Sequence, residues 1–267
     1  MANSDFSGYA DDGLDVVYGS TIEECDKKLK LVVLEKVEWY RSIGLSLNLN
    51  KSEIIGIGYS PAPVKIDDTL ICPKQEITFL GVKIQSDLKW SSQVSALSGK
   101  IRSAASRIRI EGRHLTITDR RMLYMGWIQS QIFCNGLVVL PTITQTEQNT
   151  LRTSLNAGIR AIVGLPKYGF ADISAIRSKL NIPSIEAITE YSLQWAAWKK
   201  FHGSSFDPVG ISTRSKANKL ILHPDQRGHR GKMYDSMLTM AWNRIPLTTK
   251  SENKSSIVKR QLKSALF

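Results

Sequence analysis

Cysteine is scarce and scattered in this chain of 267 residues. The three cysteines, Cys25, Cys72 and Cys134, form no Cys-x-x-Cys pair, which excludes a cysteine-type zinc finger or knuckle. An odd, dispersed set also provides no disulfide framework and is typical of a reducing compartment. The four histidines show no metal-ligand spacing either. We therefore expect neither a structural zinc site nor disulfide cross-links.

Long hydrophobic runs are also missing. The longest apolar stretch, residues 136–140, stops at Pro141 and is far shorter than the roughly 18 residues that cross a bilayer. The first residues lack the basic region and apolar core of a signal peptide. We therefore expect a soluble, intracellular protein with no membrane partner, in the nucleus or the cytoplasm.

Acidic residues are few relative to basic ones. The chain has 36 Lys and Arg against 24 Asp and Glu, which gives a formal net charge of +12. Its hydrophobic fraction of 42% is ordinary for a globular protein and argues against general disorder. A basic excess of this size indicates an anionic partner, most often nucleic acid.

Hydrophobic periodicity changes along the sequence. In the first third, short alternating runs predict strands, and the Ser20-x-x-Glu23 pattern predicts one helix with a capping box. Residues 76–84 are expected to form one strand, with Gly81 at a point where a side chain would crowd a neighbour. From about Trp90 the period changes from two to about 3.6, which predicts a series of helices.

These patterns predict an α+β fold class. Residues 1–86 would combine antiparallel hairpins with one packed helix, whose apolar stripe is interrupted by Lys36. Residues 87–202 would be all-helical. Residues 203–232, rich in Gly, Ser, Pro, Arg and Lys, would form a loop or linker, and residues 233–267 would return to short helices.

Tyr9-Ala10-Asp11-Asp12 is the sharpest motif in the sequence. Two adjacent carboxylates at a predicted hairpin tip repel each other unless a cation lies beside them. Mg²⁺ prefers carboxylate oxygens and keeps coordination positions open for substrate phosphates, and two such ions can hold both oxygens of a phosphoryl displacement. Asp-Asp-Gly is also good turn chemistry on a solvated loop, and the tetrapeptide alone does not separate the two interpretations.

The order of motifs resembles that of the reverse transcriptases of non-LTR, LINE-like retrotransposons. The resemblance begins with residues 9–12, which are similar to the Tyr/Phe-Ala-Asp-Asp motif of the palm. It continues through a lysine motif at Lys51 and a primer-grip-like Phe79-Leu80-Gly81 into a helical thumb. Residues 242–246 and 258–266 are similar to the Trp-Asn-x-Leu-Pro and Phe-Lys-x-x-Leu-Lys ending of these polyproteins, so the match covers nearly the whole chain in order.

The resemblance implies RNA-directed DNA polymerisation, with an RNA template, a DNA primer and an incoming deoxynucleotide as partners and Mg²⁺ as the metal. Asp11 would be the main metal ligand and Asp12 a helper. Lys51 would stabilise negative charge on the departing pyrophosphate, and Phe79-Leu80-Gly81 would position the primer end. From the residues alone, Lys51 is as well explained as a solvated lysine at the start of a strand, and Phe79-Leu80-Gly81 as an ordinary core strand.

The family's other catalytic aspartate lies on a palm strand upstream of this motif, and the chain begins a few residues before Tyr9. Because two metals need carboxylates from two strands, we expect the isolated chain to be an inactive fragment of a polymerase. A non-catalytic nucleic-acid-binding module and a decayed remnant of an element are the alternatives. Missing strands would also expose sheet edges, so we expect marginal stability for residues 1–86.

Basic residues dominate the segment from residue 98 to residue 124, where Glu111 and Asp119 are the acids. Residues seven apart share a helical face, and the arginine fork suits phosphate. The segment therefore predicts salt-sensitive contacts with a nucleic-acid backbone, with a solvated helix face as the alternative. The basic residues are Lys100, Arg102, Arg107, Arg109, Arg113, Arg120 and Arg121.

Two other features have simpler interpretations. Trp195, Trp198 and Phe201 are spaced three apart, and we interpret them as a core stripe in preference to a base-stacking surface. Residues 227–232 could contact a phosphate backbone, but a flexible linker is the preferred interpretation. No residues identify an RNase H or endonuclease site.

Overall fold

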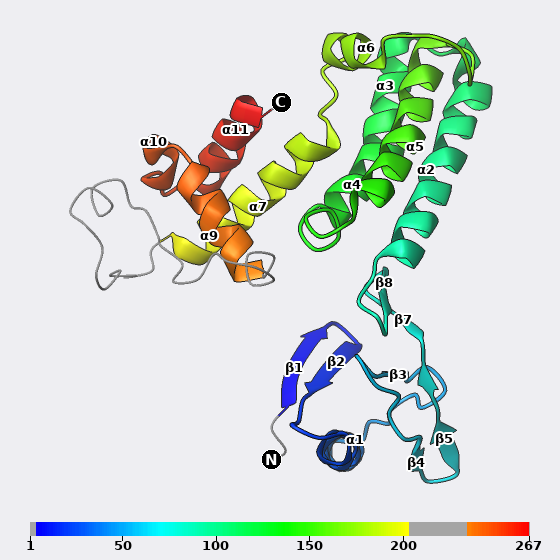
Figure 1. Ribbon diagram of the computed structural model, residues 1–267, viewed down its shortest axis with the longest axis vertical. Helices are drawn as coiled ribbons and strands as arrows, with labels where there is room; N and C mark the ends of the chain where they lie inside the picture. The colour runs from blue at the N-terminus through cyan, green and yellow to red at the C-terminus, as the bar shows by residue number, and fades with distance from the viewer. Residues whose placement is uncertain (1–3, 203–233, 267) are drawn as a thin grey trace. The chain divides into compact units, whose positions relative to one another are not determined.

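The computed structural model describes residues 4–202 and 234–266 (Figure 1). The chain divides into two compact units, Met1–Ser95 and Ala96–Phe267, and each is described by itself below. In the described residues, all strands belong to the first unit and most helices to the second. The predicted α+β class is confirmed. The predicted linker, residues 203–232, lies outside the described residues.

The first unit begins with the expected hairpin. Strands β1 (Ser4–Tyr9) and β2 (Asp12–Val17) pair antiparallel, and Tyr9 opposite Asp12 closes the ladder. The turn itself is the pair Ala10-Asp11, whereas the sequence suggested Asp11 to Gly13. Ala10 has a φ of 54°, the positive value that a two-residue hairpin turn requires at its first position.

Helix α1 (Ile22–Ser42) follows, and its predicted cap is wrong by one residue. The cap is Thr21, whose hydroxyl accepts a hydrogen bond from the Glu24 backbone N–H at 3.2 Å. The Glu24 carboxylate in turn accepts from the backbone N–H of Ser20 at 2.8 Å. One amide of the first helical turn and the amide of the residue before the cap are thereby satisfied, which resembles a capping box with its partners shifted along the chain.

The rest of this unit consists of small two-stranded sheets instead of one continuous sheet. The expected single strand at residues 76–84 is wrong, because Leu80 and Gly81 turn the chain into a hairpin. Their φ values are 47° and 79°, and two successive positive values are typical of a tight hairpin turn. A Cβ on Gly81 would meet nothing within 4 Å, so backbone conformation and not crowding explains this glycine. The pairs are β3 (Ile54–Ile55) with β6 (Pro73–Lys74), parallel, and β4 (Val64–Ile66) with β5 (Thr69–Ile71) and β7 (Glu76–Phe79) with β8 (Val82–Gln85), antiparallel.

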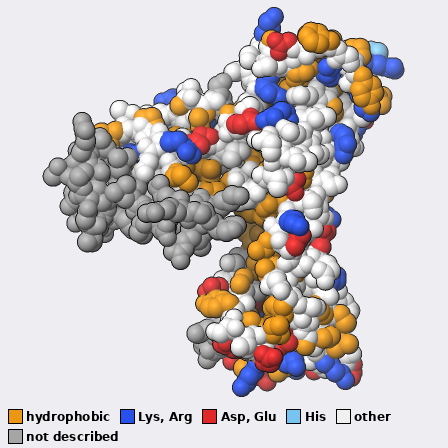
Figure 2. Space-filling model, in the orientation of Figure 1, with side chains coloured by type: hydrophobic (Ala, Val, Ile, Leu, Met, Phe, Trp, Pro, Cys, Tyr) orange, Lys and Arg blue, Asp and Glu red, His pale blue; other side chains and the backbone are white. Residues whose placement is uncertain are grey.

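The core of the first unit is small. It gathers buried side chains of α1, β3, β4 and β5, namely Val37, Ile54, Val64, Ile66 and Ile71. Many large apolar side chains of the unit remain exposed, and Figure 2 shows hydrophobic side chains over its surface. A thin core with exposed apolar surface gives little burial energy per residue.

Helices make up the described part of the second unit. α2 (Ser91–Glu111) crosses the boundary between the units, and α5 (Gln145–Val163) ends at Gly164, whose φ of 75° is the left-handed conformation of a glycine C-cap. The helices predicted from about Trp90 onward are present, and the structure adds α6, which the sequence did not reveal. The remaining elements are η1 (Gly112–His114), α3 (Ile117–Tyr124), the π-helical turn η2 (Met125–Gln129), α4 (Ser130–Asn135), α6 (Ile173–Lys179), α7 (Ile185–Phe201), α9 (Tyr234–Arg244), α10 (Leu247–Lys250) and α11 (Ser255–Leu266).

The C-terminal helices pack on α7. Buried residues of α7, α9 and α11 form one cluster that includes Trp198, Leu238, Trp242 and Leu262. Among residues 4–202 and 234–266, none of the helices is both long and apolar enough to cross a membrane.

Candidate metal and nucleic-acid sites

The carboxylates of Asp11 and Asp12 are exposed at the tip of the β1–β2 hairpin. Strand alternation puts Asp12 and its partner Tyr9 on the sheet face opposite to Phe6 and Asp15. In the part of the chain that the structure describes, no group of three or more His, Cys, Asp or Glu could hold a metal ion. Mg²⁺ is commonly held by one or two carboxylates plus substrate phosphates, so this pair fits one such ion.

A lysine of α1 fixes the hairpin in place. Lys36 Nζ lies 3.4 Å from the centroid of the Phe6 ring and 2.7 Å from Asp15 Oδ2. Phe6 and Asp15 face each other across the two strands, so one ammonium group fastens both strands to the helix. This contact explains why a lysine interrupts the apolar stripe of α1. The lysine within the apolar stripe was visible in the sequence, but the sequence did not reveal that Phe6 and Asp15 are its partners.

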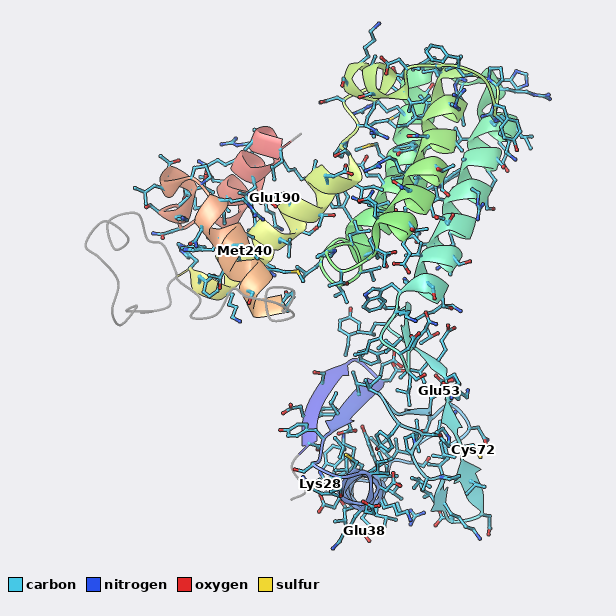
Figure 3. All side chains as sticks on the ribbon, in the orientation of Figure 1. Lys28, Glu38, Glu53, Cys72, Glu190 and Met240 are labelled. Carbon is cyan, nitrogen blue, oxygen red and sulfur yellow. The ribbon has the colours of Figure 1, made fainter. Side chains whose placement is uncertain are left out.

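Lys51 is exposed in a turn, where its backbone N–H donates to the Asn48 carbonyl at 3.0 Å. Within the described residues, no hydrogen bond or ion pair joins Lys51 to Asp11 or Asp12. Glu53, labelled in Figure 3, pairs with Lys74 at 2.6 Å and so connects the ends of β3 and β6. The hydrogen bond from Lys74 lowers the pKa of the Glu53 carboxyl.

Phe79-Leu80-Gly81 lies at the end of the β7–β8 hairpin, with the Leu80 side chain 51% exposed. Phe79 is the last residue of β7, but Leu80 and Gly81 form the turn, so the alternative of an ordinary core strand is wrong for these two residues. Lys83 holds this hairpin in two ways. Its backbone N–H donates to Gln93 Oε1 on α2 at 3.0 Å, and its ammonium pairs with Glu76 at 2.6 Å. The hydrogen bond from Lys83 is the main cause of the lowered pKa of Glu76.

Three of the seven predicted nucleic-acid-binding residues are used inside the fold. Arg109 donates to the Leu165 carbonyl just beyond α5 at 2.6 Å, and Arg120 donates to the Ala161 carbonyl in its last turn at 3.4 Å. Arg121 donates to the Leu180 and Asn181 carbonyls after α6 at 2.5 and 3.2 Å. Carbonyls at the end of a helix have no partner within the helix, and a cation there also complements the helix dipole.

The other four, Lys100, Arg102, Arg107 and Arg113, are exposed. Arg102 Nε donates to the Ser98 carbonyl within α2 at 3.3 Å, and Arg113 Nε donates to His114 Nε2 at 3.1 Å. Lys100 and Arg107 line one groove, which confirms that this pair shares a helical face. Arg102 and Arg109, which are also seven apart, do not act together, because Arg109 is engaged with the carbonyl of Leu165.

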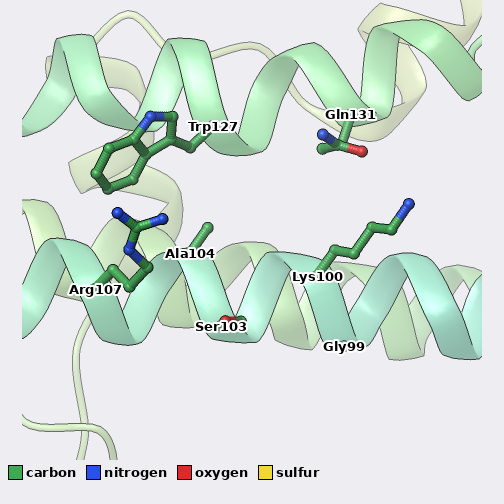
Figure 4. A pocket seen from close by; sticks show the side chains of 7 residues that line it. All are labelled: Gly99, Lys100, Ser103, Ala104, Arg107, Trp127 and Gln131. Carbon is green, nitrogen blue, oxygen red and sulfur yellow. The ribbon is translucent and has the colours of Figure 1, made fainter.

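The groove lies between α2 and the helical segment of η2 and α4, and has a volume of about 490 Å³ (Figure 4). Small residues of α2 line it together with Lys100 and Arg107, and Trp127 and Gln131 face them from the other side. Arg107 Cζ lies 4.5 Å from the Trp127 ring centroid, and its Nε lies 3.2 Å from Glu111 Oε1. Trp127 falls within the region where the period of about 3.6 predicts helices. No pattern in it signals the π-helical turn that carries this side chain.

Comparison with known proteins gives no family for this chain. No family model, no curated protein and no solved structure matches it. An assignment of function therefore depends on the chain's own residues, chiefly the carboxylate pair of the β1–β2 hairpin and the basic groove on α2.

Proposed function

We propose that this chain is part of an RNA-directed DNA polymerase of the non-LTR retrotransposon type. The first unit would belong to the palm, and α2 to α5 to the thumb. The observation that carries the proposal is the Tyr9-Ala10-Asp11-Asp12 motif at the end of a β-hairpin, with both carboxylates exposed. The motif order along the chain and the basic groove on α2 support the same assignment.

In such a polymerase, a primer 3′-hydroxyl attacks the α-phosphate of a deoxynucleotide. Mg²⁺, when bound, neutralises the phosphate charge that develops in this displacement. Asp11 and Asp12 would hold the ion, and their exposure leaves room for the phosphates on the face that points away from α1. Lys51 is exposed and would offer its positive charge to the leaving pyrophosphate.

The described residues bring one carboxylate pair, and no further metal-holding group, to this hairpin. Since two-metal catalysis needs carboxylates from a second strand, we expect no primer extension by this chain with Mg²⁺ and deoxynucleotides. The measurement is a primer-extension assay on a primed RNA template. Extension that disappears in an Asp11→Asn variant would contradict this expectation and show that the chain is catalytically complete.

The proposed nucleic-acid contact is the groove of Lys100, Arg107 and Trp127. Its two cations sit on one face of a rigid helix, and the Trp127 ring holds the Arg107 guanidinium in position. A rigid row of cations is suited to successive phosphates of a backbone. Binding without extension is also what a non-catalytic nucleic-acid-binding module would show, and the groove favours this as the second candidate function.

The test is filter binding of a primed RNA template at low salt. We expect a Lys100→Gln/Arg107→Gln variant to bind at least about tenfold more weakly than the unmodified chain, because two phosphate contacts are lost. The matched control is Lys30→Gln/Lys65→Gln, which removes the same charge from exposed positions of the first unit. Equal weakening by both variants would mean that net charge alone explains binding, and would remove the groove from the proposal.

A further inference from the structure

Three lysines of α7 and α11 converge on two aromatic rings of α7. Lys199 Nζ and Lys259 Nζ lie 5.5 and 4.8 Å from the centroid of the Trp195 ring. Lys263 Nζ lies 5.9 Å from the centroid of the Tyr191 ring. Cations at such distances are attracted by the ring, and the ring also supports the aliphatic stem of the lysine. The three ammonium groups are therefore held in place on the surface. We call these five residues the lysine–aromatic surface.

The rings beneath the lysines are fixed by the core. The Trp195 and Trp198 rings stack with centroids 5.3 Å apart and an angle of 9° between planes. Trp198, which is buried, stacks in turn on His202 at 4.4 Å, and Tyr191 packs edge-on against Phe133 at 5.9 Å. Rings held in this way cannot turn outward to stack on nucleobases. The surface therefore offers positive charge and no aromatic platform for bases.

The positive charge of the surface is not compensated by protein carboxylates. Within residues 4–202 and 234–266, Lys199, Lys259 and Lys263 form no ion pair. Lys259 and Lys263 are four apart on α11, a spacing at which like charges repel. The nearby carboxylate of Glu190, labelled in Figure 3, is engaged by Arg244 through two hydrogen bonds of 2.6 and 2.7 Å. An external anion would relieve this repulsion.

We propose that the lysine–aromatic surface is a second nucleic-acid contact, which binds the phosphates of a nucleic-acid strand without reading its bases. It is separate from the α2 groove and does not depend on polymerase activity. A row of phosphates matches several lysines at once, whereas the fixed rings leave no means of base recognition. A membrane is disfavoured, because Val258 and Leu262 of α11 are buried in the core and unavailable for insertion.

The test uses the full chain and a fluorescein-labelled oligouridylate, whose anisotropy is followed over a series of salt concentrations. For a Lys199→Gln/Lys259→Gln/Lys263→Gln variant, we expect the slope of log affinity against log salt to become shallower by about 2, since each single-strand phosphate contact contributes about 0.7. Affinity at low salt should fall at least about tenfold. The corresponding variant with three arginines should bind like the unmodified chain. Thermal unfolding of the glutamine variant verifies that its fold is retained.

The matched control, Lys179→Gln/Lys254→Gln/Arg260→Gln, removes three charges from exposed positions of the same unit. An unchanged slope in the lysine variant, or an equal change in the control, would overturn the proposal. So would a lysine variant that loses binding to phosphatidylserine vesicles but keeps binding to the oligouridylate. The Lys100→Gln/Arg107→Gln variant is measured in parallel. If only that variant weakens binding, the groove is retained and the second contact is rejected.

Discussion

Replacing Ile159 with alanine is expected to lower the free energy of unfolding of the helical unit by about 2–5 kcal/mol. Ile159 lies on α5 and its side chain is completely buried. Truncation removes apolar atoms from a close-packed interior and leaves a cavity that the surrounding helices fill only in part. Urea unfolding followed by tryptophan fluorescence measures the change, with the slope of the transition checked for constancy.

The control for this prediction is Ile110→Ala. Ile110 is the same residue type on α2, but its side chain is 66% exposed. Its truncation should change the free energy of unfolding by less than about 0.5 kcal/mol, since little apolar surface leaves water there. Similar losses in the two variants would contradict the core described for the helical unit.

The helices were predictable because their signals are local. Buried residues such as Ile101 and Ile108 of α2 are seven apart, and this spacing is visible in the sequence. The end of α5 was equally visible, since Gly164 is the residue type that adopts a left-handed cap without strain. The exception is α6, which has only seven residues, none of them buried, and so leaves no apolar stripe to detect.

The strands were less predictable because their pairing is not local. β3 pairs in parallel with β6 across a segment that contains another hairpin, and each of the two strands has only two residues. The alternation at residues 45–49 is as regular as a strand pattern, yet these residues find no partner strand and form no ladder. Short strands depend on the partner that tertiary structure provides, and a single sequence does not identify that partner.

The candidate site was predictable only in part. The Asp11-Asp12 tip follows from turn chemistry within a few residues. The roles of the arginines do not follow from nearby residues, because Arg109 and Arg121 donate to carbonyls 56 and 59 residues away in the chain. Charge counting grouped them with Lys100 and Arg107, although Lys100 and Arg107 line the groove while Arg109 and Arg121 bind backbone carbonyls. Only the packing of α2 and α3 against the ends of α5 and α6 separates structural arginines from solvent-facing cations.

The distinction between arginines used inside the fold and cations that face solvent predicts how binding of a primed RNA template depends on salt. Replacing all four exposed cations, Lys100, Arg102, Arg107 and Arg113, with glutamine should make the slope of log affinity against log salt shallower by between about 3 and 4. Each cation that neutralises a duplex phosphate contributes about 0.9 to this slope, because it releases condensed counterions. The ratio of the affinity of the unmodified chain to that of the variant should therefore fall about a hundredfold between about 50 and 200 mM salt.

Single substitutions sharpen this prediction. Lys100 has no ion pair in the described residues and should contribute the full value of about 0.9 to the slope. Arg107 should contribute less, because its guanidinium must give up Glu111 before it meets a phosphate, and the freed carboxylate then repels the backbone. Replacing Glu111 with glutamine should accordingly raise affinity at low salt and bring the contribution of Arg107 up to that of Lys100. If Glu111→Gln leaves affinity unchanged while Arg107→Gln lowers it, the Arg107–Glu111 pair does not compete with nucleic acid, and Arg107 binds phosphate with that pair intact.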